Sequence, residues 1–188
     1  MSSITSRIIL STILAAAAIT ADAKIVAGVK FDDSVRVNGQ TLVLNGAGVR
    51  KKLFIKVYAG ALYLPTNQRD AATILAADVP RRMVMHFVFD VGKGKIAEAW
   101  TEGLKANTPN APADVKNAFH TLSSWMEDMK KGQEIVLTYG PATGTTVEVN
   151  GKVKGTLPGK AVADAILATW IGPKPGPGSD FKNAVLGK

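Results

Sequence analysis

Two Asn-Gly pairs constrain the fold of this chain more than any other local feature. Asn38-Gly39 and Asn150-Gly151 each lie between two short segments rich in β-branched and aliphatic residues. Asn-Gly readily adopts the positive φ angles of a type I′ turn, so each pair predicts a β-hairpin. The predicted strands of these hairpins are 35–37 with 41–44 and 145–149 with 152–157.

The segments between the hairpins predict a mixture of strands and helices. Helical spacing of apolar residues, Pro80 as a helix stop and Ser179 as a helix cap set most of the boundaries. Strands joined largely by hairpins, with helices segregated along the chain, favour an α+β fold with a mostly antiparallel sheet and a helical layer on one face. We expect a loop at 46–48, strands at 53–64, 81–91 and 134–139, and helices at 67–78, 95–106, 112–131, 160–171 and 179–186.

The first 23 residues have the three parts of a secretory signal peptide. Arg7 provides a positive start, residues 8–19 form an apolar run, and Ala21-Asp22-Ala23 places small residues at the two positions that a signal peptidase recognises. The run is too short to cross a bilayer core of about 30 Å. We therefore expect cleavage after Ala23, an exported periplasmic protein, and a single mature domain at 24–188.

Composition narrows the chemistry of the mature domain. Hydrophobic residues make up 46% and charged residues 20%, as expected for a globular domain, and no later segment is long enough for a transmembrane helix. The chain has no cysteine and two histidines, His86 and His120, which excludes thiolate catalysis and a three-histidine zinc site. The net charge of +8 suits an anionic ligand or surface, and export argues against nucleic acid as the partner.

The segment 46–64 carries the most specific motif. It reads Gly-x-Gly-Val-Arg at 46–50 and Lys-Val-Tyr-Ala-Gly-x-Leu-Tyr at 56–63. These residues resemble the chalcone isomerase-like family, in particular its bacterial and fatty-acid-binding branches. The likeness extends more weakly over the mature chain, including Trp170-Ile171-Gly172 near its end. The resemblance implies an open-faced β-sandwich with a helical layer and a cleft between sheet and helices.

The resemblance also implies two ligand-binding residues. In the fatty-acid-binding branch, an arginine and the tyrosine of the Lys-Val-Tyr-Ala segment hold the ligand carboxylate, and Arg50 and Tyr58 match both positions. The plant isomerases instead use an arginine with a threonine and a second tyrosine. Here Tyr58 stands where we align the threonine, and no tyrosine lies near Lys93-Gly94-Lys95. These departures argue against chalcone cyclisation.

The chemistry of these residues suits an amphipathic acid. A guanidinium offers a planar fork of donors to a carboxylate, and a phenol adds one donor beside an apolar ring. In a straight strand Arg50 and Tyr58 would lie about 26 Å apart at about 3.3 Å per residue, so we predict a turn near Lys51-Lys52. An adaptable apolar wall for the ligand is expected from the odd residues of the strand 81–91, namely Met83, Met85, Phe87 and Phe89.

These residues also have purely structural interpretations. Arg50 could pair with a surface carboxylate, Tyr58 could be an ordinary strand tyrosine, and the Met and Phe stripe could be core beneath a helix. The hypothesis that we favour is an exported, non-catalytic protein that binds a fatty acid or a similar amphipathic carboxylate, without a cofactor or a metal. The alternatives are an isomerase of the intramolecular lyase class, a haem-binding protein with His86, His120, a tyrosine or a methionine as axial ligand, and a structural or partner-binding protein of the envelope.

Overall fold

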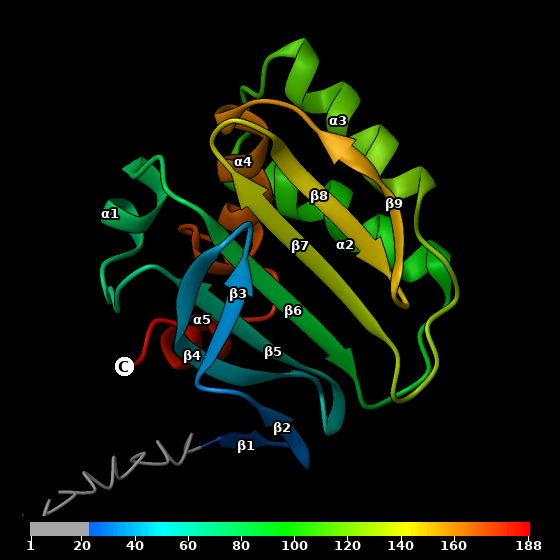
Figure 1. Ribbon diagram of the computed structural model, residues 1–188. Coiled ribbons are helices and arrows are strands. Elements are labelled where there is room, and N and C mark those ends of the chain that lie inside the picture. Colours follow the sequence, from blue (N-terminus) through cyan, green and yellow to red (C-terminus); the bar gives the residue numbers. More distant parts are fainter. Residues whose placement is uncertain (1–22) are drawn as a thin grey trace, which may run out of the picture.

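A seven-stranded antiparallel sheet forms the centre of the protein (Figure 1). The computed structural model describes residues 23–188. Each strand of the sheet pairs with its neighbour in sequence, in the order β3-β4-β5-β6-β7-β8-β9, and β1 and β2 form a separate hairpin. The strands are β1 (Lys24–Val26), β2 (Val29–Phe31), β3 (Ser34–Val37), β4 (Gln40–Lys52), β5 (Ile55–Leu64), β6 (Arg81–Phe87), β7 (Glu134–Gly140), β8 (Gly144–Val149) and β9 (Lys152–Leu157).

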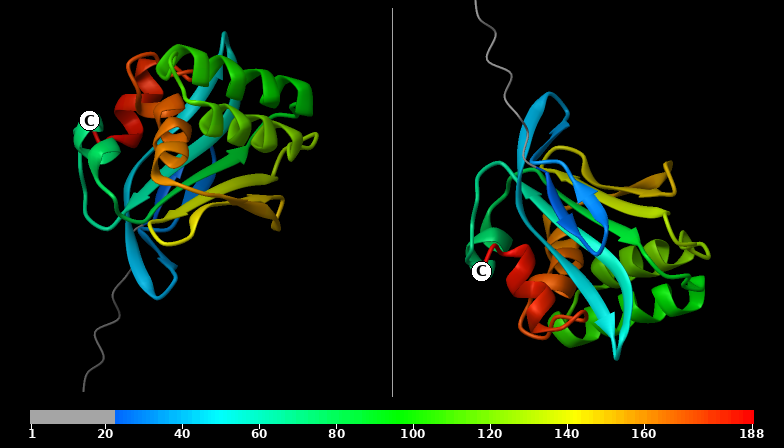
Figure 2. Two further views of the ribbon diagram at one scale, coloured as in Figure 1. Left: turned by 90° about the horizontal axis from the view of Figure 1, so that it is seen from above. Right: turned by 90° about the horizontal axis from the view of Figure 1, so that it is seen from below.

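The larger helices gather on one side of the curved sheet (Figure 2). Here α4 packs against α2, α3 and β8, and α5 lies along β4. The helices are α1 (Ala71–Ala76), α2 (Lys93–Asn107), α3 (Ala113–Ser124), α4 (Lys160–Ile171) and α5 (Ser179–Val185). The prediction of an α+β fold, an open-faced sandwich of mostly antiparallel strands with a helical layer on one face, is confirmed. Both Asn-Gly hairpins are also present, with Asn38 and Asn150 at φ angles of 49° and 50°.

Alternation along β5 separates two hydrophobic cores. Tyr58 and Leu62 face the helices and belong to the larger core. Ala59, Ala61 and Tyr63 point to the other face, because successive strand residues alternate. There they pack with residues of β1 to β4 in a smaller core. The sheet is therefore buried on both faces along β5, and all strands and core residues that the structure describes lie within residues 24–188.

The predicted loop at 46–48 is wrong, because these residues lie inside β4. A β-carbon at Gly46 would lie 2.3 Å from the carbonyl oxygen of Ala184, and one at Gly48 would lie 2.7 Å from the β-carbon of Ala184. The glycines are thus needed for the close approach of α5 to the strand, not for a turn.

Several predicted boundaries are also wrong. The helix expected at 67–78 is limited to α1, whose N-cap is Asp70. The helix expected at 112–131 ends at Ser124, although Met126 and Met129 are buried as its spacing suggested. The predicted cap, Ser179, makes no capping bond; Gly178 occupies that position. Apolar spacing thus identified buried residues better than it identified element ends.

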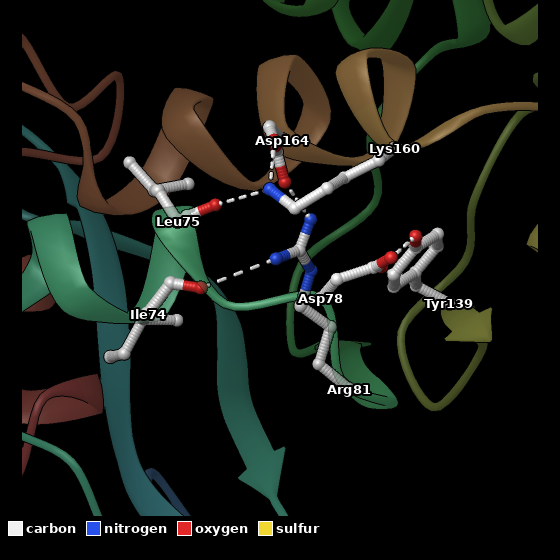
Figure 3. A network of polar contacts seen from close by, with 7 residues as sticks. All are labelled: Ile74, Leu75, Asp78, Arg81, Tyr139, Lys160 and Asp164. Atoms are coloured by element: carbon white, nitrogen blue, oxygen red, sulfur yellow. Dashed lines mark hydrogen bonds and ion pairs between the residues drawn. The ribbon is translucent and has the colours of Figure 1, made fainter. Parts of the chain in front are cut away.

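A polar network around the buried side chain of Arg81 fastens the helical layer to the sheet (Figure 3). Arg81 at the start of β6 is only 3% exposed; it donates to the carbonyl of Ile74 and forms an ion pair of 2.5 Å with Asp164 of α4. Lys160 donates to the same carboxylate and to the carbonyl of Leu75. One carboxylate therefore balances two cations and ties α1, β6 and α4 together.

The described residues leave the export prediction untested. Except for Ala23, the predicted signal peptide lies outside them. Within residues 23–188, no helix is both long and apolar enough to span a membrane.

Candidate functional site

Arg50 and Tyr58 are direct partners across the β4–β5 hairpin. The turn that allows this lies at Leu53 and Phe54, two residues later than predicted, because Lys52 pairs with Ile55. A register shift between Arg50 and Lys51 adjusts the pairing near the hairpin end. The Arg50 guanidinium carbon lies 5.9 Å from the centre of the Tyr58 ring. The hairpin thus brings the two predicted residues together.

An apolar cavity of about 250 Å³ opens beside this pair, between the sheet and helices α2 and α4. Tyr58 and Phe87 form its sheet side, and Trp100 and Trp170 come from the helices. Gly103 allows the two helices to approach closely, since a β-carbon there would lie 2.9 Å from the Thr169 side chain. The remaining lining residues are Arg50, Val57, Met85, Val91, Lys95, Ile96, Ala99, Glu102, Gly103, Ala106, Thr169, Lys174, Gly176 and Pro177.

The Tyr58 hydroxyl accepts a hydrogen bond of 2.9 Å from the indole nitrogen of Trp170. Its own proton has no acceptor within residues 23–188. Burial raises the pKa of Tyr58 to about 12, although the Arg50 charge and the Trp170 hydrogen bond act to lower it. The phenol therefore stays protonated at neutral pH and keeps one donor to offer a ligand.

Arg50 supplies the positive charge of the site. It is half-buried, and within the described part of the chain it forms no ion pair with a carboxylate. It lines the inner cavity and also an outer hollow of about 470 Å³ that leads toward the hairpin tip. Lys95 lines both spaces too, and so does one carboxylate, Glu102. Lys95 is paired with Glu98 at 2.7 Å, so Arg50 is the cation without an ion-pair partner among the described residues that line both spaces.

Only two residues of the predicted apolar wall belong to this site. Met85 and Phe87 line the cavity. Met83 lies nearer the start of β6, in the core beside a much smaller hollow. Phe89 follows the end of the strand and lines the outer hollow. The structure thus brings Arg50, Tyr58, Met85 and Phe87 around one cavity and places Met83 and Phe89 outside it.

The two tryptophans are the largest of the lining residues that the sequence analysis did not assign to a site. Trp100 and Trp170 meet edge to face, with ring centres 5.2 Å apart. Trp170 lies in a helix that was predicted, and its position in the Trp-Ile-Gly element was the available signal. No pattern in the sequence pairs it with Tyr58, because the two residues are 112 positions apart.

The cavity does not use either histidine. His86 lies on the opposite face of β6 from Met85 and contacts Glu134 at 2.8 Å, and His120 is exposed on α3. Within residues 23–188 no group of three His, Cys, Asp or Glu residues could hold a metal ion. An axial ligand for haem at this cavity would therefore have to come from Tyr58 or Met85.

Comparisons with known proteins agree with this architecture. The family described as chalcone isomerase-like matches residues 23–187. A crystal structure of a fatty-acid binding protein of Arabidopsis thaliana, AtFAP1, shares the fold with a TM-score of 0.65 and 19% identity; the match covers 85% of this chain and 92% of that one. A search of curated proteins found no match.

Proposed function

Because the chain belongs to the chalcone isomerase-like family, we propose that it is a non-catalytic binding protein for a fatty acid or a similar amphipathic carboxylate. Arg50 and Tyr58 hold the carboxylate, and the apolar side chains around the cavity contact the acyl chain. The family includes fatty-acid binding proteins, and the plant protein with the same fold is one of them.

The observation that carries this proposal is the unused donor capacity beside an apolar cavity. The Tyr58 hydroxyl accepts from Trp170 and so directs its own proton elsewhere, and the Arg50 guanidinium lacks an anionic partner in the described structure. A carboxylate would accept from both groups at once. Hydrogen bonds that involve a charged group contribute about 1.5–3 kcal/mol each, so the pair could discriminate strongly for an acid.

Neither of the two hydroxyl side chains that line the inner cavity, Thr169 and Tyr58, is suited to acid–base catalysis, which supports binding without catalysis. Thr169 lines the same cavity, but its hydroxyl already donates to the carbonyl of Ile166 at 2.8 Å. Tyr58, with its raised pKa, is a poor proton source for a reaction at neutral pH. An assay for the loss of chalcone absorbance tests the isomerase alternative directly, and the binding proposal predicts no change above the uncatalysed rate.

The location of the protein forms part of the proposal. The signal-like segment at 1–23 supports export to the periplasm, where a carrier for a sparingly soluble acid would be useful. Mass determination of the protein from a periplasmic extract would test this, because removal of residues 1–23 is expected. A chain that retains them in the cytoplasm would refute export and leave the binding site unaffected.

Native mass spectrometry of the protein purified without detergent tests the binding function. Copurified acyl acids are expected on the wild type and not on Arg50→Ala. Arg36→Ala is a matched control, because Arg36 is an exposed arginine of β3 that contacts only the backbone of Gly39 among the described side-chain bonds. An empty wild-type protein that also fails to take up added oleate would overturn the proposal.

A further inference from the structure

The hairpin that carries Arg50 and Tyr58 ends in an exposed apolar tip, formed by Leu53, Phe54 and Ile55. Phe54 is 100% exposed, Leu53 is 87% exposed and Ile55 is 46% exposed. The tip protrudes past the neighbouring helices in both views of Figure 2, where it is the cyan end of the β4–β5 hairpin. The folded domain therefore gains almost nothing from the apolar side chains of Leu53 and Phe54.

The backbone conformation of the tip also indicates that its sequence does not serve the stability of the domain. Leu53 has a φ angle of 55°, in the left-handed region that leucine rarely adopts. The other two tight hairpins of the sheet place Asn38 and Asn150 at this conformation, and asparagine tolerates it well. At 53 the chain keeps a strained leucine, and no contact within the domain explains that choice.

Exposed apolar side chains are concentrated at this end of the molecule. Of the six large ones that are exposed within residues 23–188, three form the tip and a fourth is Phe89. Leu53, Ile55 and Phe89 all line the outer hollow. This hollow shares Arg50 and Val57 with the inner cavity, so the apolar cluster surrounds the mouth of the proposed binding site.

Three exposed lysines flank the tip: Lys51, Lys52 and Lys56. Within the described residues none of them forms an ion pair. The nearby carboxylates Asp90 and Glu98 are already paired, with Lys130 and Lys95. One further carboxylate, Glu102, lines the outer hollow. Three lysines without ion-pair partners behind an apolar tip are complementary to an anionic lipid surface, whose head groups attract cations and whose interior accepts apolar groups.

We propose that the apolar tip inserts into the surface of a bilayer that contains anionic phospholipid, with the three lysines among the head groups. This docking rests on the tip alone. Its consequence rests on the proposed function: the outer hollow then faces the membrane, and an acyl chain passes between bilayer and cavity without crossing water. A second copy of the chain is a poorer partner, because a symmetric contact between tips would bring two sets of lysines together.

Flotation of residues 24–188 with vesicles tests the docking. This segment contains every strand, helix and core residue that the structure describes, and its use keeps the signal-like segment out of the assay. Binding to phosphatidylcholine vesicles with added phosphatidylglycerol is expected to exceed binding to pure phosphatidylcholine by about tenfold or more and to weaken with salt. Equal binding to both vesicles, or binding to neither, would overturn the proposal.

The matched variant is Leu53→Asn combined with Phe54→Gly, which gives the tip the turn sequence of the other two hairpins. It should fold at least as well as the wild type and lose vesicle binding by about tenfold or more. Val153→Ser removes an exposed apolar side chain from β9 and should bind vesicles like the wild type. If Val153→Ser has the same effect as the tip variant, the tip is not the docking element.

Two further measurements separate the possible failures. Oleate affinity in solution should be equal in the wild type and in Phe54→Ser, because Phe54 lines neither space, whereas transfer of oleate from vesicles should be slower in Phe54→Ser. Loss of vesicle docking with intact oleate binding would overturn this inference alone; docking without oleate binding would overturn the proposed function alone. Sedimentation that shows a dimer in the wild type and a monomer in the variant would assign the tip to self-association instead.

Discussion

Trp170 of α4 and Tyr58 of β5 are joined by a buried hydrogen bond of 2.9 Å, in which the indole donates and the phenol accepts. The bond connects the helical layer to the sheet at the wall of the cavity. It also fixes the direction in which the phenol can donate. The same contact therefore affects both the stability of the domain and its preference for a ligand with an acceptor.

Tyr58→Phe should weaken binding and stability together. The change keeps the ring but removes a donor to the ligand and leaves the buried Trp170 indole without its acceptor. We expect oleate to bind about tenfold more weakly and the free energy of unfolding to fall by about 1–3 kcal/mol. Calorimetric titration and urea unfolding measure the two effects. Unchanged oleate affinity in a folded variant would remove Tyr58 from the site.

Filling the passage between cavity and outer hollow should block binding without unfolding the protein. Ala99 of α2 is half-buried and lines both spaces. In Ala99→Phe the ring would occupy this passage, so oleate titrations should give no heat while the thermal midpoint stays close to the wild type. Thr101→Phe is the control, because Thr101 is exposed on the same helix outside both spaces. Full binding by Ala99→Phe would place the acyl chain elsewhere.

Alkaline titration should reveal the burial of the tyrosines. Burial raises the pKa values of Tyr58, Tyr63 and Tyr139 to about 12, and these are the three tyrosines of the chain. Tyrosinate absorbance should therefore stay low at pH 10 in the folded protein and appear there once urea unfolds it. Substantial ionisation of the folded protein at pH 10 would contradict the buried phenols.

The same shifts make the folded state less stable in alkali. Below the unfolded pKa of 10.0, Tyr58 is protonated in both states and its contribution is fully present. As the pH rises from 10 toward about 12, only the unfolded chain releases the proton, so the contribution of Tyr58 falls by about 1.4 kcal/mol per pH unit. Urea unfolding at a series of pH values should show this loss, and Tyr58→Phe should show less of it.

Removal of Asp164 should destabilise the domain more than removal of an exposed acid. Asp164→Ala leaves the buried side chain of Arg81 without its counter-charge, at an expected loss of about 3–5 kcal/mol. Glu98→Gln breaks only the exposed pair with Lys95 and should leave the urea midpoint almost unchanged. Equal effects of the two changes would mean that water reaches Arg81.

Local sequence signals predicted the parts of the fold that depend on neighbouring residues. The Asn-Gly pairs specified two hairpins, and alternation along 81–87 identified the buried face of β6. The pairing of Arg50 with Tyr58 was implied by the resemblance to the chalcone isomerase-like family, and strand geometry added that the chain must turn between them. Only the position of that turn differed, because nothing in the sequence marks Leu53-Phe54 as a turn.

Features that depend on distant residues could not be predicted in this way. Gly46 and Gly48 suggested a loop. They are glycines instead because α5, near the C-terminal end of the chain, packs so closely against them that a β-carbon would not fit. The far wall of the cavity comes from Trp100 and Trp170, whose positions depend on how two helices cross. In the sequence, Phe89 continues the alternation that includes Met85. In the structure β6 ends at Phe87, so Phe89 lies beyond the strand and lines the outer hollow instead.

The most direct test of the central claim compares oleate with its methyl ester, which keeps the acyl chain and removes the charge. Competition titrations should show that the wild type prefers oleate by about tenfold or more, and that Arg50→Ala loses this preference while still binding the ester. Equal affinities in the wild type, or a preference that survives in Arg50→Ala, would show that Arg50 and Tyr58 do not hold a carboxylate.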